Sequence, residues 1–232
     1  MFVVIFEVQP KPERWDDYLE TAKLLRPEIE QIDGFIDNER FKSQRTEGRV
    51  LSLSTWRDEK ALVRWRTQAT HHTQGQTRGR FEIFADYHLR VGEVTADSAT
   101  PDGARLTGQR FDLTEVGVAA VITLTEIAPS SDLPMDFATG GDSPTERAPG
   151  GDGTATLDAS DDGAAGLVDR EWFASLTTEG KRILLASWQD AEAGAAYAPA
   201  LGRSDRHRQV RVIRDYGMRD RREAPQYFPD VT

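Results

Sequence analysis

The sequence predicts an α+β protein in which two similar units follow one another and close into one barrel within the chain. A strand that ends in Trp56 and a later strand that carries Tyr87 recur as a strand ending in Trp188 and a later strand carrying Tyr216. The spacing between Trp and Tyr is nearly the same in both places, and an Asp that can begin a helix follows each Trp. Such a repeat decides the architecture, because two copies of one unit can pack together as a pseudo-dimer.

The first unit, residues 1–97, contains every element of a β-α-β-β-α-β, or ferredoxin-like, order. Apolar residues follow Pro12 at helical spacing, and Pro12 suits a first helical turn. Pro27 is expected to kink this helix or delimit its last turn. The expected strands are 2–8, 35–43, 49–56 and 80–94, and the expected helices are 15–32 and 58–69.

The second unit, residues 113–220, follows a linker at 98–112 and lacks a regular first helix. Its expected strands are 116–127, 169–175, 182–188 and 209–219, with a helix at 190–198. Residues 129–166 are rich in Asp, Gly, Pro, Ser and Thr, which predicts a flexible acidic insertion that could cover a cleft. Residues 221–232 are expected to form an extended arm.

Composition excludes several classes of function. The net charge of −10 argues against a nucleic-acid binder, which needs a basic face. The absence of cysteine rules out disulfides and thiolate metal sites, and no His-x-His or His-Glu-x-x-His spacing predicts a metal site. No apolar run is long enough to span a membrane, and Met1 leads directly into a strand-like run rather than a secretory signal. A cytoplasmic location is expected.

Several segments of the chain resemble the antibiotic biosynthesis monooxygenase family of the dimeric α/β-barrel superfamily. They are Gly34-Phe35, Leu51 to Asp58, the His71-His72 region, and the stretch from Gly79-Arg80 to Arg90-Val91. The resemblance covers residues 1–95 well and 113–220 more weakly. It implies two ferredoxin-like units paired into a barrel whose clefts bind aromatic or other small ligands. Some members of the family are similar to cofactor-independent oxygenases of polyketide quinols, and others resemble haem-degrading enzymes.

An oxygenase of this type needs a base, a cation or donor that holds an oxyanion, and aromatic walls. The first unit offers such residues between its second helix and its last strand. The candidate catalytic residues are His72, Arg80, His71 and Tyr87, and the candidate substrate-binding residues are Trp65, Asn38, Arg40 and Phe84.

Each candidate also has a structural interpretation. Trp56 and Trp188 are expected in the core, and Tyr87 could be a core tyrosine with a hydrogen-bonded hydroxyl. Adjacent histidines project in different directions, so only one of the pair at 71–72 is expected to reach a ligand. His207 lies in what the repeat predicts to be the corresponding segment of the second unit.

The leading hypothesis is a small-molecule oxygenase of secondary metabolism. It would oxidise an aromatic or polyketide-type phenol or hydroquinone with O₂, without flavin or metal, since no Gly-x-Gly-x-x-Gly follows a strand. The partners expected are a small aromatic substrate and O₂, with the chain acting as a monomeric pseudo-dimer or a homodimer.

Two alternatives stay open. The first is a non-catalytic ligand-binding or assembly protein whose clefts are filled by side chains. The second is a haem protein with His71 or His72 as the axial ligand. Haem-degrading relatives use an asparagine on the first strand, where this chain has Phe6-Glu7-Val8.

Overall fold

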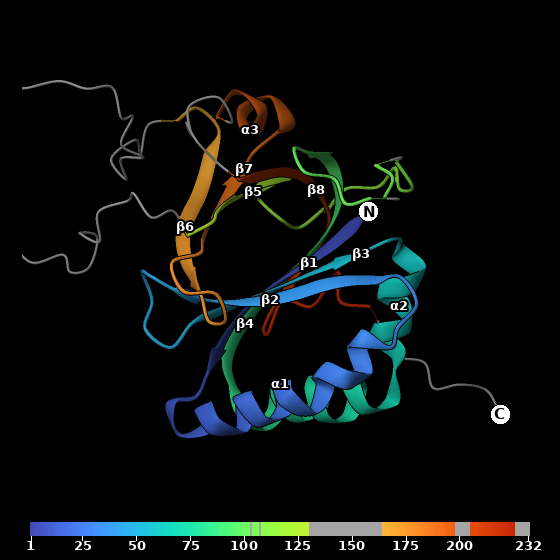
Figure 1. The fold of residues 1–232 in the computed structure, drawn as a ribbon, viewed down its shortest axis with the longest axis vertical. Coiled ribbons are helices and arrows are strands. Elements are labelled where there is room, and N and C mark those ends of the chain that lie inside the picture. The colour runs from blue at the N-terminus through green and yellow to red at the C-terminus, as the bar shows by residue number, and fades with distance from the viewer. Residues whose placement is uncertain (103, 107, 130–163, 198–204, 226–232) are drawn as a thin grey trace, which may run out of the picture.

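A computed structural model describes residues 1–102, 104–106, 108–129, 164–197 and 205–225. Eight antiparallel strands form a closed barrel, in the order β1-β3-β2-β6-β7-β5-β8-β4. Two longer helices, α1 and α2, lie on one side of the barrel, and the short α3 lies on the opposite side (Figure 1). The fold is therefore α+β, with one helix layer much larger than the other.

The strands of the first half are β1 (Phe2–Pro10), β2 (Phe35–Ser43), β3 (Val50–Trp56) and β4 (Phe84–Asp97). Those of the second half are β5 (Val121–Ile127), β6 (Leu167–Ser175), β7 (Arg182–Trp188) and β8 (Arg206–Gly217). The helices are α1 (Trp15–Glu30), α2 (Glu59–Thr67) and α3 (Ala191–Tyr197), with a 3₁₀ turn η1 (Pro12–Arg14) and two π-helical segments, η2 (His71–Thr77) and η3 (Gly79–Ile83).

The two halves of the chain have the same strand order. The first half runs β2-β3-β1-β4 and the second β6-β7-β5-β8, and the pairs β2–β6 and β4–β8 join them. The β4–β8 seam is the longer one, from His88 opposite Gly217 to Asp97 opposite Arg208. Closure within one chain leaves none of the eight described strands with an edge open to another molecule.

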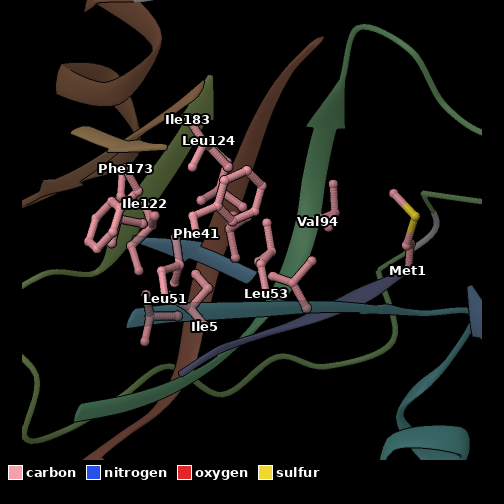
Figure 2. Packing of buried hydrophobic residues seen from close by; sticks show 14 residues of the cluster. Met1, Ile5, Phe41, Leu51, Leu53, Val94, Ile122, Leu124, Phe173 and Ile183 are labelled. Atoms are coloured by element: carbon pink, nitrogen blue, oxygen red, sulfur yellow. The ribbon is translucent and has the colours of Figure 1, made fainter. Parts of the chain in front are cut away.

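The alternation of side chains along each strand separates two layers of core. On β1, Val3 and Ile5 point into the barrel, where they join the cluster shown in Figure 2. Phe2 points outward and packs beneath the helices with the fully buried Trp56. Trp188 is equally buried in the second half. The prediction that both tryptophans belong to the core is confirmed.

Two buried arginines link the two halves of the barrel. Arg90 on β4 donates to Glu7 on β1 at 2.6 Å and to Ser187 on β7, in the other half, at 2.8 Å. The equivalent contacts of the second half run from Arg208 on β8 to Glu126 on β5 at 2.6 Å and to Thr55 on β3, in the first half, at 3.2 Å. Each half therefore uses an arginine to satisfy its own carboxylate and to reach the other half.

Two predicted strands begin several residues too early, and the other strand boundaries differ from the prediction by three residues or fewer. The last strand of the first half begins at Phe84 rather than 80, because η2 and η3 continue as π-helix to Ile83. The first strand of the second half begins at Val121 rather than 116, and Val118 is 79% exposed. In both places a short alternation of apolar residues imitates a strand, which periodicity over a few residues cannot distinguish from other structure.

The predicted position of His207 is also wrong. It lies on β8, where Nδ1 is 2.9 Å from the Thr125 hydroxyl, and not in a helical segment like the one that holds His71 and His72. Most of the predicted insertion at 129–166 and residues 226–232 of the predicted arm lie outside the described residues. None of the helices in the described part of the chain is long and apolar enough to span a membrane.

Candidate functional site

A cavity of about 1240 Å³ lies between the helices of the first half and the outward face of their sheet. Its floor is formed by outward-pointing residues of β1 to β4, such as Val4, Phe6 and Leu89. Its walls come from α1, α2, η2 and η3, including Leu25 and Leu62. The volume suits a small organic molecule, and about half of the lining residues are apolar.

All eight residues that the sequence analysis named as candidates line this cavity. They are His71, His72, Arg80, Tyr87, Trp65, Asn38, Arg40 and Phe84. The structure brings them together from β2, α2, η2, η3 and β4. Arg80 comes from a π-helical segment rather than from the strand that the sequence predicted.

The His71 ring is fixed in one orientation. It stacks on Trp65, with ring centres 4.1 Å apart and an angle of 14° between the planes. Nδ1 lies 2.9 Å from the Trp65 carbonyl oxygen, so this nitrogen carries the proton and Nε2 keeps a free lone pair. Burial lowers the pKa of His71 to about 4, against the opposing effect of the hydrogen bond to the Trp65 carbonyl. The ring is therefore neutral at physiological pH.

The π-helical segment is tied to α1 and shaped by glycines. Arg78 forms an ion pair with Asp17 of α1 at 2.8 Å. A Cβ atom at Gly75 would come within 2.8 Å of the His71 ring, and one at Gly79 within 2.5 Å of the Phe84 ring. Both glycines therefore allow aromatic rings of the site to pack against backbone, which a larger residue would prevent.

A polar group faces the cavity from β2. Asn38 donates to the Ser52 hydroxyl and to the Leu53 carbonyl, both at 3.1 Å, which holds the amide against β3. Two residues along the strand, Arg40 lies close to Tyr18 of α1. Burial raises the pKa of Tyr18, and the neighbouring Arg40 guanidinium opposes this shift. Tyr18 therefore keeps its proton and can donate a hydrogen bond inside the cavity.

The second half of the chain completes the cavity. Ile213 and Tyr216 of β8 line it, together with Arg221 in the segment that follows. Arg221 donates to the Tyr87 hydroxyl, and its guanidinium lies 5.8 Å from the centre of the Tyr216 ring. Burial raises the pKa of Tyr216 to about 12; the nearby Tyr87 adds to this effect and three guanidinium groups oppose it. Tyr216 is thus protonated at neutral pH.

Sequence reasoning missed four polar residues of the site: Tyr18, Arg66, Tyr216 and Arg221. Tyr18 and Arg66 sit on the amphipathic helices, where a polar residue beside the apolar stripe is normally expected in solvent. Tyr216 matches Tyr87 in the repeat, and this match was the available signal for its position near a cleft. Nothing local in the sequence indicates that Arg221 returns to the first half.

Among the residues that the structure describes, no three His, Asp or Glu side chains converge where they could hold a metal ion.

Comparison with known proteins gives both a family and a fold. The family model for antibiotic biosynthesis monooxygenase matches residues 1–78. A protein of Pyricularia oryzae called jasmonate monooxygenase ABM is 41% identical over 236 residues, which cover 100% of both chains. The crystal structure of an aldoxime dehydratase aligns with a TM-score of 0.52 and 11% identity, over 97% of this chain and 88% of that chain. The latter likeness concerns the fold alone.

Full-length identity at this level leaves no domain of the relative unmatched. The match of the family model to residues 1–78 includes β1 to β3, α1 and α2, which form most of the cavity. The chain belongs to the antibiotic biosynthesis monooxygenase family.

Proposed function

We propose that the protein is a monooxygenase that oxidises a small organic molecule in the cavity of the first half. The observation that carries this proposal is the convergence of histidine, arginine and tyrosine side chains, together with apolar residues, on one space of about 1240 Å³. The full-length relative named as a monooxygenase supports the reaction class. We also interpret the chain as two joined ferredoxin-like units, of which the first carries the site; the shared strand order supports this interpretation.

For the reaction itself we retain a phenol or hydroquinone of aromatic or polyketide type as a substrate, oxidised without flavin or metal. A phenol with a free para position needs no external reductant, because phenol and O₂ give a quinone and water. The carbon atom loses its hydrogen and gains one oxygen atom, while the other oxygen atom leaves as water. Deprotonation of the phenol makes the ring electron-rich enough to react with O₂, and exclusion of water favours this step.

The roles of the side chains follow from their surroundings. His72 is the proposed base, since His71 is held against Trp65 and its lowered pKa makes it a weak acceptor of protons. Arg80 is the proposed cation that holds the negative charge of the substrate. The Tyr87 hydroxyl is proposed to form a hydrogen bond with the substrate. The proposed binding surface consists of Trp65, Asn38, Arg40 and Phe84.

The name of the relative suggests a second class of substrate. Jasmonate is a cyclopentanone that carries a carboxylate, and the hydrogens next to its ketone are acidic enough to be removed by a base. Such a molecule is small enough to enter the cavity, and its apolar body suits apolar lining residues such as Leu25 and Phe84. Insertion of one oxygen atom into an unactivated C–H bond would require two further electrons from a reductant. We therefore favour attack of O₂ at the CH₂ carbon next to the ketone, which can form an anion. This reaction needs no reductant when that carbon becomes a second carbonyl: the carbon loses two hydrogen atoms and gains one oxygen atom, and the other oxygen atom leaves as water.

A haem protein is a second candidate function, and one observation favours it. The Nδ1 atom of His71 is bound to the Trp65 carbonyl, which is how an axial histidine is usually oriented, with Nε2 left for the iron. An absorption spectrum of the purified protein separates the candidates. A Soret band that disappears in His71→Ala would establish haem binding, and a flavin band would overturn the cofactor-free proposal.

The non-catalytic alternative required clefts that are filled by side chains. The volume of the first cavity disfavours this alternative, although a pure binding protein could also have an open site. Oxygen consumption in the presence of phenols and of jasmonate distinguishes binding from catalysis, because a binding protein consumes none.

The proposed roles are tested by three substitutions. His72→Ala and Arg80→Ala should lower turnover by about 10²-fold or more, as loss of a base or of an oxyanion partner commonly does. His207→Ala is the control, because His207 lies on β8 against Thr125. Loss of activity in His207→Ala with retention in His72→Ala would place the reaction outside the first cavity.

A further inference from the structure

We propose that Arg66, Arg80 and Arg221 form a binding site for the carboxylate of the substrate, and that Glu223 positions Arg221 within it. The inference deepens the proposed function and rests on it for the identity of the cavity. It assigns part of the substrate specificity to the C-terminal segment, which belongs to the second half of the chain.

The first observation is that these arginines lack acidic partners. Three other arginines around the cavity are paired: Arg26 with Glu30 at 2.8 Å, Arg214 with Asp112 at 3.7 Å, and Arg222 with Asp220 at 2.5 Å. Arg40 of β2 also has no acidic partner among the described residues, but it lies beside Tyr18 of α1 rather than with the three proposed residues near Tyr216. In the described part of the chain, no carboxylate lies within ion-pair distance of the three proposed residues. The Nε atoms of Arg66 and Arg80 are buried and have no hydrogen-bond partner there.

The second observation is that all three arginines line the same cavity as Tyr216. The Arg221 guanidinium lies 5.8 Å from the centre of the Tyr216 ring, and all three guanidinium groups oppose the rise that burial causes in the pKa of Tyr216. Arg66 comes from α2, Arg80 from η3, and Arg221 from the segment after β8. Three separate elements therefore bring positive charge to the part of the cavity around Tyr216.

The third observation concerns the anchor of the C-terminal segment. The Glu223 carboxylate accepts hydrogen bonds from the Thr114 hydroxyl at 2.9 Å, the Glu115 backbone at 2.7 Å and the Asp215 backbone at 2.6 Å. These bonds fix the segment against β8 and the chain that precedes β5. Two residues before this anchor, Arg221 is held on the Tyr87 hydroxyl and over the Tyr216 ring.

Physical chemistry indicates which ligand fits. Half-buried cations without counterions are costly, and an anion that displaces water there forms charge-assisted hydrogen bonds, which are the strong ones. A guanidinium group suits a planar carboxylate, which can accept two parallel hydrogen bonds from it. The rest of the cavity is lined by residues such as Phe6, Leu25 and Phe84. The expected ligand is therefore a monocarboxylate with an apolar body.

The test compares an acid with its methyl ester, because esterification removes the charge and leaves the body of the molecule unchanged. Jasmonate and methyl jasmonate would each displace the anionic dye 1-anilinonaphthalene-8-sulfonate from the wild-type protein. We expect the acid to bind at least about 10-fold more tightly than the ester, with a preference that weakens at high salt. Equal affinities, or no binding of the acid, would overturn the proposal without the need for any variant.

Single substitutions test which arginines cause the preference for the acid over the ester. Arg66→Gln, Arg80→Gln and Arg221→Gln should each reduce the ratio of acid to ester affinity by about 5-fold or more, and Arg26→Gln should leave it unchanged. An equal reduction in Arg26→Gln would mean that only the general positive charge of the cavity matters, which contradicts the proposal.

The positioning role of Glu223 has its own control. Glu223→Gln replaces one acceptor oxygen with a donor, so we expect a loss of acid preference like that of Arg221→Gln. Glu115→Gln changes an exposed neighbour whose side chain takes no part in the anchor. If Glu223→Gln keeps the full acid preference, the positioning role is wrong.

The failures of the two proposals are distinguishable. If the acid preference exists but no substrate is turned over, the carboxylate site stands and the proposed function fails. If acid and ester are bound and turned over equally well, the proposed function stands and the carboxylate site fails.

Discussion

At the scale of the residue, the environment of His71 separates two histidines that the sequence presents as neighbours. His71 stacks on Trp65 and is held through its Nδ1 atom, while Gln68 accepts a hydrogen bond from its backbone at 2.6 Å. His72 lines the same cavity without sharing this arrangement. We therefore assign His71 to the shape and hydrogen bonding of the site and His72 to proton transfer.

The lowered pKa of His71 predicts a pH-dependent stability. In the unfolded chain the imidazole takes up a proton near pH 6.5, whereas in the folded protein it does so only near pH 4. The contribution of neutral His71 to the free energy of unfolding is therefore complete above pH 6.5, and it is lost progressively as the pH decreases toward 4. His71→Phe keeps a ring beside Trp65 and removes this titration. Between pH 7 and pH 5, urea unfolding should show a loss in wild type that exceeds the loss in His71→Phe by about 2 kcal/mol. Identical losses would contradict the assignment.

The candidate residues could be predicted because they lie on elements that one unit folds by itself. The resemblance placed Arg80 and the histidines near a cleft, and the alternation on the hairpin placed Asn38 and Arg40 on one face. Arg221 and Tyr216 could not be predicted in the same way, because their position depends on how the second half closes the barrel.

At the scale of the element, the β4–β8 seam carries the tightest packing between the halves. Gly92 on β4 lies against β8, where a Cβ atom would come within 2.2 Å of Val210 and 2.9 Å of the Arg211 carbonyl oxygen. The register shifts between Val91 and Gly92, which brings the two backbones close together. A residue with a Cβ atom would therefore clash with β8, so this position requires glycine.

Gly92→Ala should destabilise the protein by about 2 kcal/mol or more, because the carbonyl oxygen of β8 cannot move without breaking the ladder. Gly108→Ala is a matched control, since a Cβ atom there meets nothing within 4 Å. Thermal or urea unfolding of both variants measures the difference. Equal stabilities would mean that the seam adapts to an added methyl group.

The π-helical segment η2–η3 shows the limit of prediction for an element. The run from Arg80 to Phe84 alternates apolar and polar residues, and this pattern predicted the start of a strand. In the structure Ile83 is buried at the end of η3, and Phe84 begins β4. The packing of this segment on α1, through the ion pair of Arg78 with Asp17, decides its conformation. A contact so distant in sequence cannot be read from local periodicity.

At the scale of the whole molecule, the barrel joins the two halves into one structure. The sequence predicted this closure from the repeat and the long last strands, and the closed strand order confirms that one chain forms the barrel. The buried ion pairs could not be predicted, since alternation indicates only that Glu7 and Arg90 lie on strands. Their side chains are 6% and 5% exposed.

Glu7→Gln should cost about 3–5 kcal/mol of the free energy of unfolding, because it leaves the Arg90 guanidinium buried without a counterion. Glu30→Gln removes a partner of the exposed Arg26 and should cost less than about 1 kcal/mol. Urea unfolding monitored by tryptophan fluorescence compares them. A small effect of Glu7→Gln would show that the pair contributes little to holding the barrel.

The central claim is that the cavity of the first half is where a small molecule is oxidised. Ala22 of α1 lines this cavity, and a large ring at that position would occupy part of it and obstruct a bound ligand. The most direct measurement is the incorporation of ¹⁸O from ¹⁸O₂ into the product, by wild type and by Ala22→Trp, with phenols and jasmonate as substrates. We predict one labelled oxygen atom in the wild-type product and a loss of at least about 100-fold in rate in a folded Ala22→Trp. Equal labelling by both proteins would show that the reaction takes place elsewhere.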